Sequence, residues 1–456
     1  MIKGLILAFV LFLSGMPAHA ETLQLDLSSA IKRALVHDPR VSEMEALVRA
    51  ARATVNEVDG YGDIQASMNT FVGFSPALKG GLFTTEDCGE SQPCVNRTDR
   101  YNVLEDGLSI WNYADFRIIK PLYTFGKLSA YLEAANADVK IKQETVQLQK
   151  NDTVYELKRA YYGHLTARDT TLFLKDMKSR LQQALNKVQI WLDEEEGQVK
   201  RSDLYALQTA TGIADSFIVQ AEALQKISMA GIKLLADIGS EVDVQLMEKK
   251  IAPVPLPVGA LDELQQKALL ERPELKQLNN GLKARRALVE ANKAMNRPDL
   301  FAGVSGMASY SWSRDRLDNP HVYDPFNDVG ATPVVGFQWK WSGSVKNARV
   351  AKAQAELDAL IEKGSFARRG IPFQVEESFK QVQAFHEAVL SLEKGSRSAR
   401  RWMIATYADF EAGVEQADKI VAAFQGYVLA YTEYLETVYD YNMHVAALER
   451  AVGVVQ

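Results

Sequence analysis

Four stretches of the chain alternate apolar and polar residues, the period-two pattern of a β-strand with one apolar face. Only the second stretch is irregular, because Trp111 and Tyr113 interrupt its polar face. Each stretch has about 10 residues or slightly more, the length that crosses a bilayer at the usual strand tilt. The pattern favours a barrel wall between lipid and water, with an antiparallel sheet on a soluble core as the alternative. The four stretches lie near residues 63–75, 107–121, 299–313 and 331–342.

A barrel of this kind needs more strands than one chain supplies. A sheet that spans a bilayer must close, since an open edge would leave backbone N–H and C=O groups unpaired in hydrocarbon. Barrels made from a single chain begin at about eight strands. Four strands from each of three copies would give a twelve-stranded barrel, with a wide helical tube below it.

Long segments with helical periodicity follow each pair of strands. No proline occurs from Gly126 to Glu196, and one continuous helix of about 70 residues would be about 100 Å long. Near the C-terminus, apolar residues recur in alternating steps of four and three, the 3.5-residue period of a left-handed coiled coil. We expect this aromatic stripe to pack against another helix. Its members are Ile420, Phe424, Tyr427, Tyr431, Tyr434, Val438, Tyr441, Val445 and Leu448.

The second long helix contains residues that disfavour a straight helix. Gly364 and Gly370 are followed closely by Pro372. Proline in a helix interior removes a hydrogen bond and kinks the helix. The sequence therefore predicts a break near 364–372, which would divide this segment into two helices.

The chain contains an internal duplication. Residues 34–41 parallel residues 268–275, and each segment places a proline where a helix restarts. Residues 251–259 between the copies are rich in proline and should form an extended linker. The first structural repeat is predicted over 21–250 and the second over 260–456. Each has a helix, two strands and a helical hairpin, with hairpin tips near 197–203 and 409–418.

The first twenty residues have the features of a secretory signal peptide. Lys3 precedes an apolar run from Leu5 to Leu13, and small residues end the segment before Glu21. The run is too short for a membrane-spanning helix, which needs about 20 apolar residues. We expect export, with a mature chain that begins at Glu21. In an oxidising compartment Cys88 and Cys94, in a polar loop, should form a short-loop disulfide.

The composition excludes several other classes of function. The chain has 456 residues and a net charge of −6, which disfavours a broad nucleic-acid-binding surface. Its six histidines are scattered singly, and neither phosphate-binding loops nor nucleophile elbows occur. We therefore expect no enzyme activity, no cofactor and no metal site.

The segment from Lys120 to Lys127 resembles the strand-to-helix junction of the TolC family of outer-membrane channel proteins. Residues 272–275, residues 297–300 and the C-terminal segment from Tyr441 to Gly453 are also similar to that family, and the resemblance covers essentially the whole mature chain. It implies a mainly α fold with membrane β-strands. Three copies would form a homotrimer with a twelve-stranded barrel among outer-membrane lipids. A long coiled-coil tunnel would extend from the barrel into the periplasm of a Gram-negative bacterium. The resemblance also implies docking to a periplasmic adaptor (membrane fusion) protein and an inner-membrane pump of RND or ABC type.

The family pattern places helix–turn–helix tips at two glycines, Gly197 and Gly413. Asp203 follows Gly197 by six residues, as the pattern has it, whereas the second tip has an acid at five and a lysine at six. The resemblance implies that tip carboxylates line a periplasmic gate, with basic residues forming ion pairs between neighbouring helices. A solvated end of a coiled coil is the alternative. The candidate gate residues are Arg201, Asp203, Asp409, Glu411, Glu415, Asp418 and Lys419.

Taken together, these features favour a passive conduit: the outer-membrane exit duct of a tripartite efflux or type I secretion system. Both systems use the same channel architecture, so both remain open. The alternative, an exported coiled-coil structural or adhesive surface protein, explains the helices but not four strands of bilayer length.

Overall fold

The computed structural model describes residues 22–77, 107–195, 199–315 and 323–454, together with the backbone of 83–84 and 94–95. Cys88 and Gly197 lie outside the described residues, as does the side chain of Cys94. The disulfide and the turn of the first tip therefore stay predictions.

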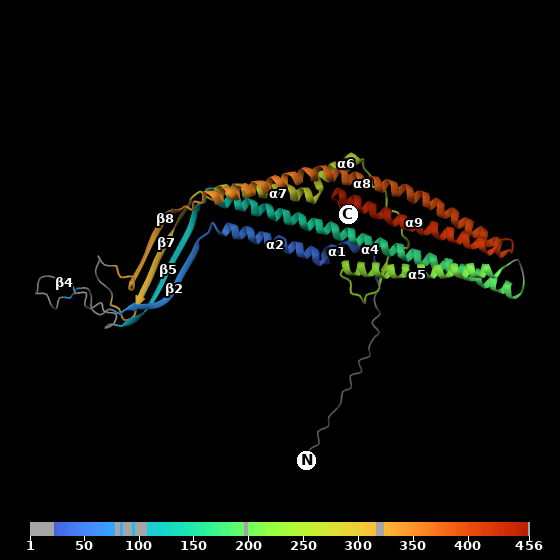
Figure 1. Ribbon diagram of the computed structural model, residues 1–456, viewed down its shortest axis with the longest axis horizontal. Helices are drawn as coiled ribbons and strands as arrows, with labels where there is room; N and C mark the ends of the chain where they lie inside the picture. The colour runs from blue at the N-terminus through green and yellow to red at the C-terminus, as the bar shows by residue number, and fades with distance from the viewer. Residues whose placement is uncertain are drawn as a thin grey trace, which may run out of the picture. The chain divides into compact units, whose positions relative to one another are not determined.

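In each half of the chain two helices, two long strands and two further helices follow one another, and the first half also contains four short strands (Figure 1). The first half contains β1 (Leu23–Leu25), α1 (Leu27–His37), α2 (Pro39–Gly60), β2 (Gln65–Pro76), β3 (Phe83–Thr84), β4 (Cys94–Val95), β5 (Leu108–Tyr123), α4 (Lys127–Asp193), α5 (Arg201–Leu235) and β6 (Val244–Leu246). The second half contains α6 (Leu261–Glu271), α7 (Pro273–Ala294), β7 (Asp299–Ser311), β8 (Asp328–Gln338), α8 (Gly343–Glu411) and α9 (Ala417–Val452).

The chain divides into two compact units, and each unit takes parts from both halves of the sequence. The first unit comprises residues 1–45, 145–275 and 367–456, and the second comprises residues 46–144 and 276–366. The units therefore do not coincide with the sequence repeats, because the long helices α4 and α8 each contribute residues to both.

A four-stranded antiparallel sheet in the order β2-β5-β7-β8 forms part of the second unit (Figure 1). Its register places Met68, Phe116, Gly306 and Ala331 in one cross-strand row. All four strands join helices at one end of this sheet, and the connections β2–β5 and β7–β8 lie at the other end, which we call the loop end.

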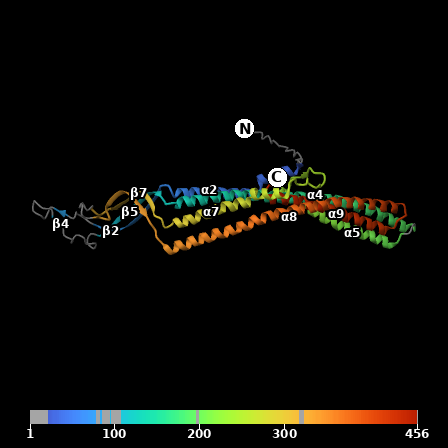
Figure 2. The ribbon, with the colours of Figure 1, turned by 90° about the horizontal axis from the view of Figure 1, so that it is seen from above.

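Four helices supply the packed centre of the first unit. The C-terminal parts of α4 and α8 run beside α5 and α9 in both views (Figures 1 and 2). The predicted seam of α9 is buried as expected: Ile420 and Val438 are fully enclosed, and Phe424 packs in the same cluster as Leu207 of α5 and Phe410 of α8. The aromatic stripe therefore serves helix packing. None of the described helices is long and apolar enough to cross a membrane.

The predicted break near 364–372 is wrong. Helix α8 continues from Gly343 to Glu411 with Pro372 in its interior. The carbonyl oxygen of Pro372 accepts a hydrogen bond of 3.0 Å from the Gln265 side chain of α6, and Ile371 and Val375 on either side are buried. Tertiary packing around the proline therefore holds a helix that local propensity alone would interrupt.

Candidate functional site: strand wall, helix tips and an open groove

The junction between strand β5 and helix α4 is built by two of the segments that carried the family resemblance, residues 120–127 and 297–300. Gly126 has a φ of +85°, a left-handed conformation that glycine adopts without steric cost. The hydroxyl of Thr124 accepts a hydrogen bond from the N–H of Leu128 in the first turn of α4. Lys127 forms a 2.7 Å ion pair with Asp299, and Arg297 donates to the carbonyl of Phe125. Strand β7 and helix α4 are thus tied together where each begins.

The sheet has one apolar face and one polar face, as the alternation predicts. Residues on the apolar face are strongly exposed in the single chain, among them Val72, Phe74, Ile110, Val329, Val335 and Phe337. The opposite face carries Asn69, Asp115, Arg117, Ser305 and Thr332 in consecutive cross-strand rows. A sheet with this division suits a wall with lipid on one side and water on the other.

The second helix tip is the turn between α8 and α9. Gly413 has a φ of +74°, and the N–H groups of Val414 and Glu415 donate to the carbonyl of Asp409 at 2.9 and 3.3 Å. Side chains of Asp409, Glu411, Asp418 and Lys419 are exposed, and Glu415 is half-buried. The turn therefore places four carboxylates and one ammonium group around a single short loop.

The turn is held by apolar and cationic contacts with the end of α4. Trp191 packs edge-on against Phe410 with ring centroids 5.2 Å apart, and the Lys187 ammonium lies 5.0 Å above the Trp191 ring. Lys187 also donates to the backbone carbonyl of Glu411 at 2.9 Å. These contacts fix the position of the tip without using any of its carboxylates.

At the first tip, Asp203 has a local structural role. Its carboxylate accepts a hydrogen bond of 2.8 Å from the N–H of Lys200, which caps the first turn of α5. Arg201 is exposed beside it. Among the described residues of one chain, neither Arg201 nor Lys419 forms an ion pair with a tip carboxylate. The tips thus expose these charges in a single chain.

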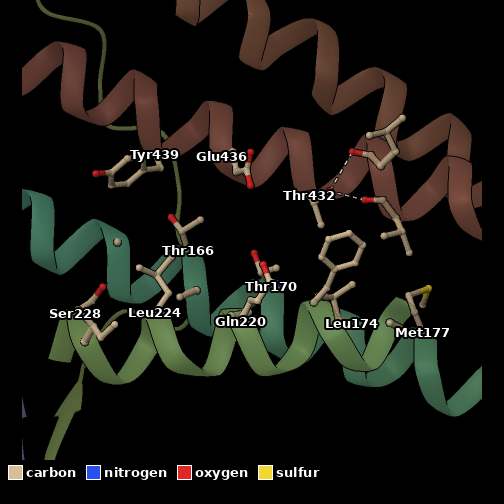
Figure 3. A pocket seen from close by; sticks show the side chains of 18 of the residues that line it. Thr166, Thr170, Leu174, Met177, Gln220, Leu224, Ser228, Thr432, Glu436 and Tyr439 are labelled. Carbon is tan, nitrogen blue, oxygen red and sulfur yellow. Dashed lines mark hydrogen bonds between the residues drawn. The ribbon is translucent and has the colours of Figure 1, made fainter. Parts of the chain in front are cut away.

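A groove of about 1200 Å³ lies between α4, α5 and α9 (Figure 3). Figure 3 shows Leu224 and Ser228 of α5 and Leu174 of α4 on one side, with Glu436 and Tyr439 of α9 on the other. Seven of the α5 residues that line it recur in alternating steps of four and three, a second coiled-coil period. They are Ile213, Phe217, Gln220, Leu224, Ile227, Gly231 and Leu234.

This seam on α5 escaped the sequence analysis, although its 3.5-residue period is visible in the sequence. Unlike the α9 seam it is open: Ile227 is 68% exposed and Leu234 is 79% exposed. The groove also affects nearby acids. Burial raises the pKa of Glu436, with Glu433 adding to the effect, and burial likewise raises the pKa of Asp440. Exposed apolar surfaces of this kind commonly mark sites of contact with a partner.

Nothing in the described part of the chain suggests a metal centre, since no group of three potential metal ligands occurs there. The arrangement offers instead a two-faced sheet, charged helix tips and an open helical seam. These features suit a wall and its contacts with other helices or chains.

Comparison with known proteins agrees with this description. Residues 264–454 match the sequence model of the outer membrane efflux protein family, whereas no curated protein sequence matches the chain. The fold is similar to that of the open MtrE outer membrane channel of Neisseria gonorrhoeae, at 15% identity and a TM-score of 0.74 over 94% of this chain and 89% of that one. It is also similar to the outer membrane protein VceC of Vibrio cholerae, at 11% identity and a TM-score of 0.72 over 94% and 96%.

The outer membrane channel CmeC of Campylobacter jejuni is a third example, at 12% identity and a TM-score of 0.74 over 94% of this chain and 85% of that one. The fold match extends over nearly the whole chain, and the sequence match covers most of its second half. The chain is thus similar to outer membrane efflux proteins in sequence over residues 264–454 and in fold over nearly its whole length.

Proposed function

We propose that three copies of this chain form an outer-membrane channel, the exit duct of a tripartite efflux or type I secretion system. The observation that carries the proposal is the sheet β2-β5-β7-β8, whose apolar face is exposed and whose outer strands β2 and β8 have no further partner strand among the described residues. In a bilayer such edges must be paired, so each sheet needs neighbours. Three sheets joined edge to edge make a closed barrel of twelve strands.

The open seam of α5 supports the same assembly. Its apolar residues include Phe217, Leu224 and Ile227, which are about half exposed or more in one chain. A coiled-coil seam of this length needs a facing helix. In a trimer that helix would come from the neighbouring copy, and the helical parts would close into a tube as the strands do.

Electrophoresis and conductance test this function. The unheated outer-membrane fraction should contain a heat-modifiable trimer, and the purified trimer should form ion-conducting pores in planar lipid bilayers. A coiled-coil adhesive or structural protein would give oligomers without pores. Recovery of the protein outside the outer membrane, or trimers that never conduct, would reject the channel.

We further propose that the helix tips dock to a periplasmic adaptor, which links the channel to an inner-membrane pump of RND or ABC type. The tip of the second hairpin exposes Val414 at 77%, an apolar side chain available to a partner. A photo-crosslinking residue at position 414 should capture an adaptor in intact cells. The matched control is position 258 in the linker, where Val258 is 97% exposed. Equal capture at the two positions would argue against docking at the tip.

The tip carboxylates are also proposed as the gate, with Asp418 ahead of Glu415 as the residue that faces the pore. In a trimer each would form a ring of three charges, which attracts cations in a narrow throat. Replacing Asp418 by Ala should weaken cation preference and block by multivalent cations. Replacing Lys419 by Ala should raise resting conductance if ion pairs between neighbouring helices hold the closed state, since such exposed pairs are worth only about 0–1 kcal/mol each. Unchanged selectivity and conductance in both variants would remove these residues from the gate.

A further inference from the structure

A short segment at the loop end of the sheet lies on the polar face of strand β7. The segment is residues 323–327, and we call it the strap. The Tyr323 hydroxyl contacts Met307 Sδ at 3.4 Å, the carbonyl of Pro325 accepts from the Ser309 hydroxyl at 2.6 Å, and the Asn327 side chain accepts from the N–H of Ser311 at 2.8 Å. The strap therefore follows β7 from residue 307 to residue 311, about 13 Å along the strand.

A buried ion pair fastens the strap. The guanidinium of Arg314 contacts both carboxylate oxygens of Asp324 at 3.1 to 3.2 Å, and the two side chains are 1% and 3% exposed. Arg314 also donates to the carbonyl of Pro76 at the end of β2 and lies 5.0 Å from the centre of the Phe326 ring. One arginine therefore joins the strap to the end of β2.

Aromatic packing adds a second attachment. Phe326 packs edge-on against Trp111 of β5 with ring centroids 5.2 Å apart, and Trp111 in turn contacts Phe71 and Tyr113. Trp111 also donates to the Ser309 hydroxyl at 2.7 Å. Trp111 and Tyr113 are the two residues that interrupt the polar face of the second strand in the sequence. The strap therefore packs on this aromatic patch through the contact between Phe326 and Trp111.

The strap end of the polar face is enclosed even in a single chain. Ser75, Ser109, Ser309 and Ser311 are all at most 2% exposed. Further along the same face Ser67 and Asn69 are exposed. Water-facing serines on a channel wall should be accessible, so their burial marks the area that the strap, its latch and the neighbouring strands enclose.

We propose that residues 323–327 form an inward-folded strap that narrows the outer end of the channel lumen, with the Arg314–Asp324 pair as its latch. The inference rests on the proposed channel, because the apolar face must contact lipid and the polar face then lines the lumen. Three copies place three straps around one exit. Breaking the latch releases the strap from the wall and widens the exit.

The test combines a chemical and an electrical measurement on the full-length trimer. A Ser311→Cys variant, made with Cys88 and Cys94 both replaced by Ser, reports release of the strap through its rate of reaction with a bulky water-soluble maleimide. Adding Asp324→Asn removes the buried carboxylate that pairs with Arg314. We expect labelling to accelerate by roughly 100-fold, which corresponds to the lower end of the usual cost of breaking a buried pair. A cysteine at Ser305, lower on the same face, should react at the same rate with and without the latch.

Single-channel conductance in planar bilayers supplies the second measurement. Asp324→Asn should raise conductance over the wild-type trimer, whereas Asp328→Asn, which removes a carboxylate from the same face of β8, should not. Phe326→Ala removes the aromatic attachment and leaves the Arg314–Asp324 pair intact. It should therefore increase both the labelling rate at position 311 and the conductance, even if Asp324→Asn assembles poorly. Unchanged conductance in the latch variants, or unchanged labelling at position 311, would overturn the strap. A wild-type trimer that labels as expected but never conducts would reject the channel function instead.

Discussion

Asp38 and Arg272 occupy equivalent positions in the two repeats and carry opposite charges. Each ends a short helix, donating its N–H to the carbonyl of Ala34 or Ala268, and each precedes the proline that begins the next helix. Asp38 pairs with Arg40 at 2.8 Å, whereas Arg272 pairs with Glu274 at 2.9 Å. The duplicated joint thus keeps its ion pair while its polarity is reversed, because either order of charges satisfies the geometry.

Replacing Asp38 with Asn should destabilise the helical part of the chain. Asp38 is 3% exposed and accepts hydrogen bonds from Arg40 and from the Thr153 hydroxyl of α4. Hydrogen bonds to a charged group contribute about 1.5–3 kcal/mol, so we expect a loss of about 2 kcal/mol at neutral pH. Thermal unfolding followed by far-UV circular dichroism measures it. Asp237→Asn, at an exposed carboxylate of the same unit, is the control and should change little. Equal thermal midpoints for Asp38→Asn and wild type would show that the Asp38 carboxylate does not stabilise the fold.

The contribution of Asp38 should depend on pH in a defined direction. Burial by itself raises the pKa of Asp38, but hydrogen bonds from Arg40 and Thr153 outweigh it and leave the pKa below its usual value. A depressed pKa stabilises the folded state fully above the unfolded pKa of about 3.9, and this stabilisation is lost as the pH falls through the folded pKa. The difference in free energy of unfolding between wild type and Asp38→Asn should be constant from about pH 5 to about pH 7 and should shrink below about pH 4. A difference that grows on acidification would contradict the assignment.

Two glycines on neighbouring strands should respond differently to alanine. A Cβ at Gly303 would collide with the backbone of Ile118 and Ile119 on β5, and backbone in a paired strand has little freedom to move. A Cβ at Gly330 would meet no atom within 4 Å. Gly303→Ala should therefore reduce the yield of heat-modifiable trimer, while Gly330→Ala should assemble normally. Quantitative electrophoresis of outer-membrane fractions measures both, and normal assembly of Gly303→Ala would place β5 and β7 further apart than described.

Restoring a main-chain donor at Pro372 should stabilise α8. Proline costs about 3 kcal/mol in a helix interior relative to alanine, and the hydrogen bond from Gln265 to the carbonyl of residue 372 can persist in the variant. We expect Pro372→Ala to raise the thermal midpoint, and Gln265→Ala to lower it by the equivalent of about 1 kcal/mol. A lower midpoint for Pro372→Ala would mean that the helix needs the geometry that proline imposes.

The open seam of α5 should control assembly. Ile227 lies on the seam at 68% exposure, and Val219 lies off it on the same helix at 65% exposure. A charge on the seam would be desolvated by a facing helix, which is strongly unfavourable without a partner charge. Ile227→Asp should therefore shift the protein from trimer to monomer in size-exclusion chromatography with light scattering, while Val219→Asp stays trimeric. If both variants are monomeric, or if neither is, the seam does not control trimerisation.

Sequence alone determined the features that depend on local periodicity. The two faces of the sheet and the buried seam of α9 follow from side-chain periods of 2 and 3.5 residues, which any strand or coiled-coil helix must obey. The strand-to-helix junction at Gly126 was also visible in the sequence, through its resemblance to a known family, and the structure shows Gly126 in a left-handed conformation that glycine favours.

Tertiary structure decided what depends on residues distant in the chain. Helix α8 stays continuous through Pro372 because Gln265 of α6 and buried neighbours hold it. Trp111 interrupts a polar face because Phe326, far along the sequence, packs on it. Asp203 is a gate candidate by spacing, and the structure adds that it caps the N-terminus of α5. A sequence pattern records which residues one element presents, whereas the contacts that those residues make are set by the packing of elements that the pattern does not connect.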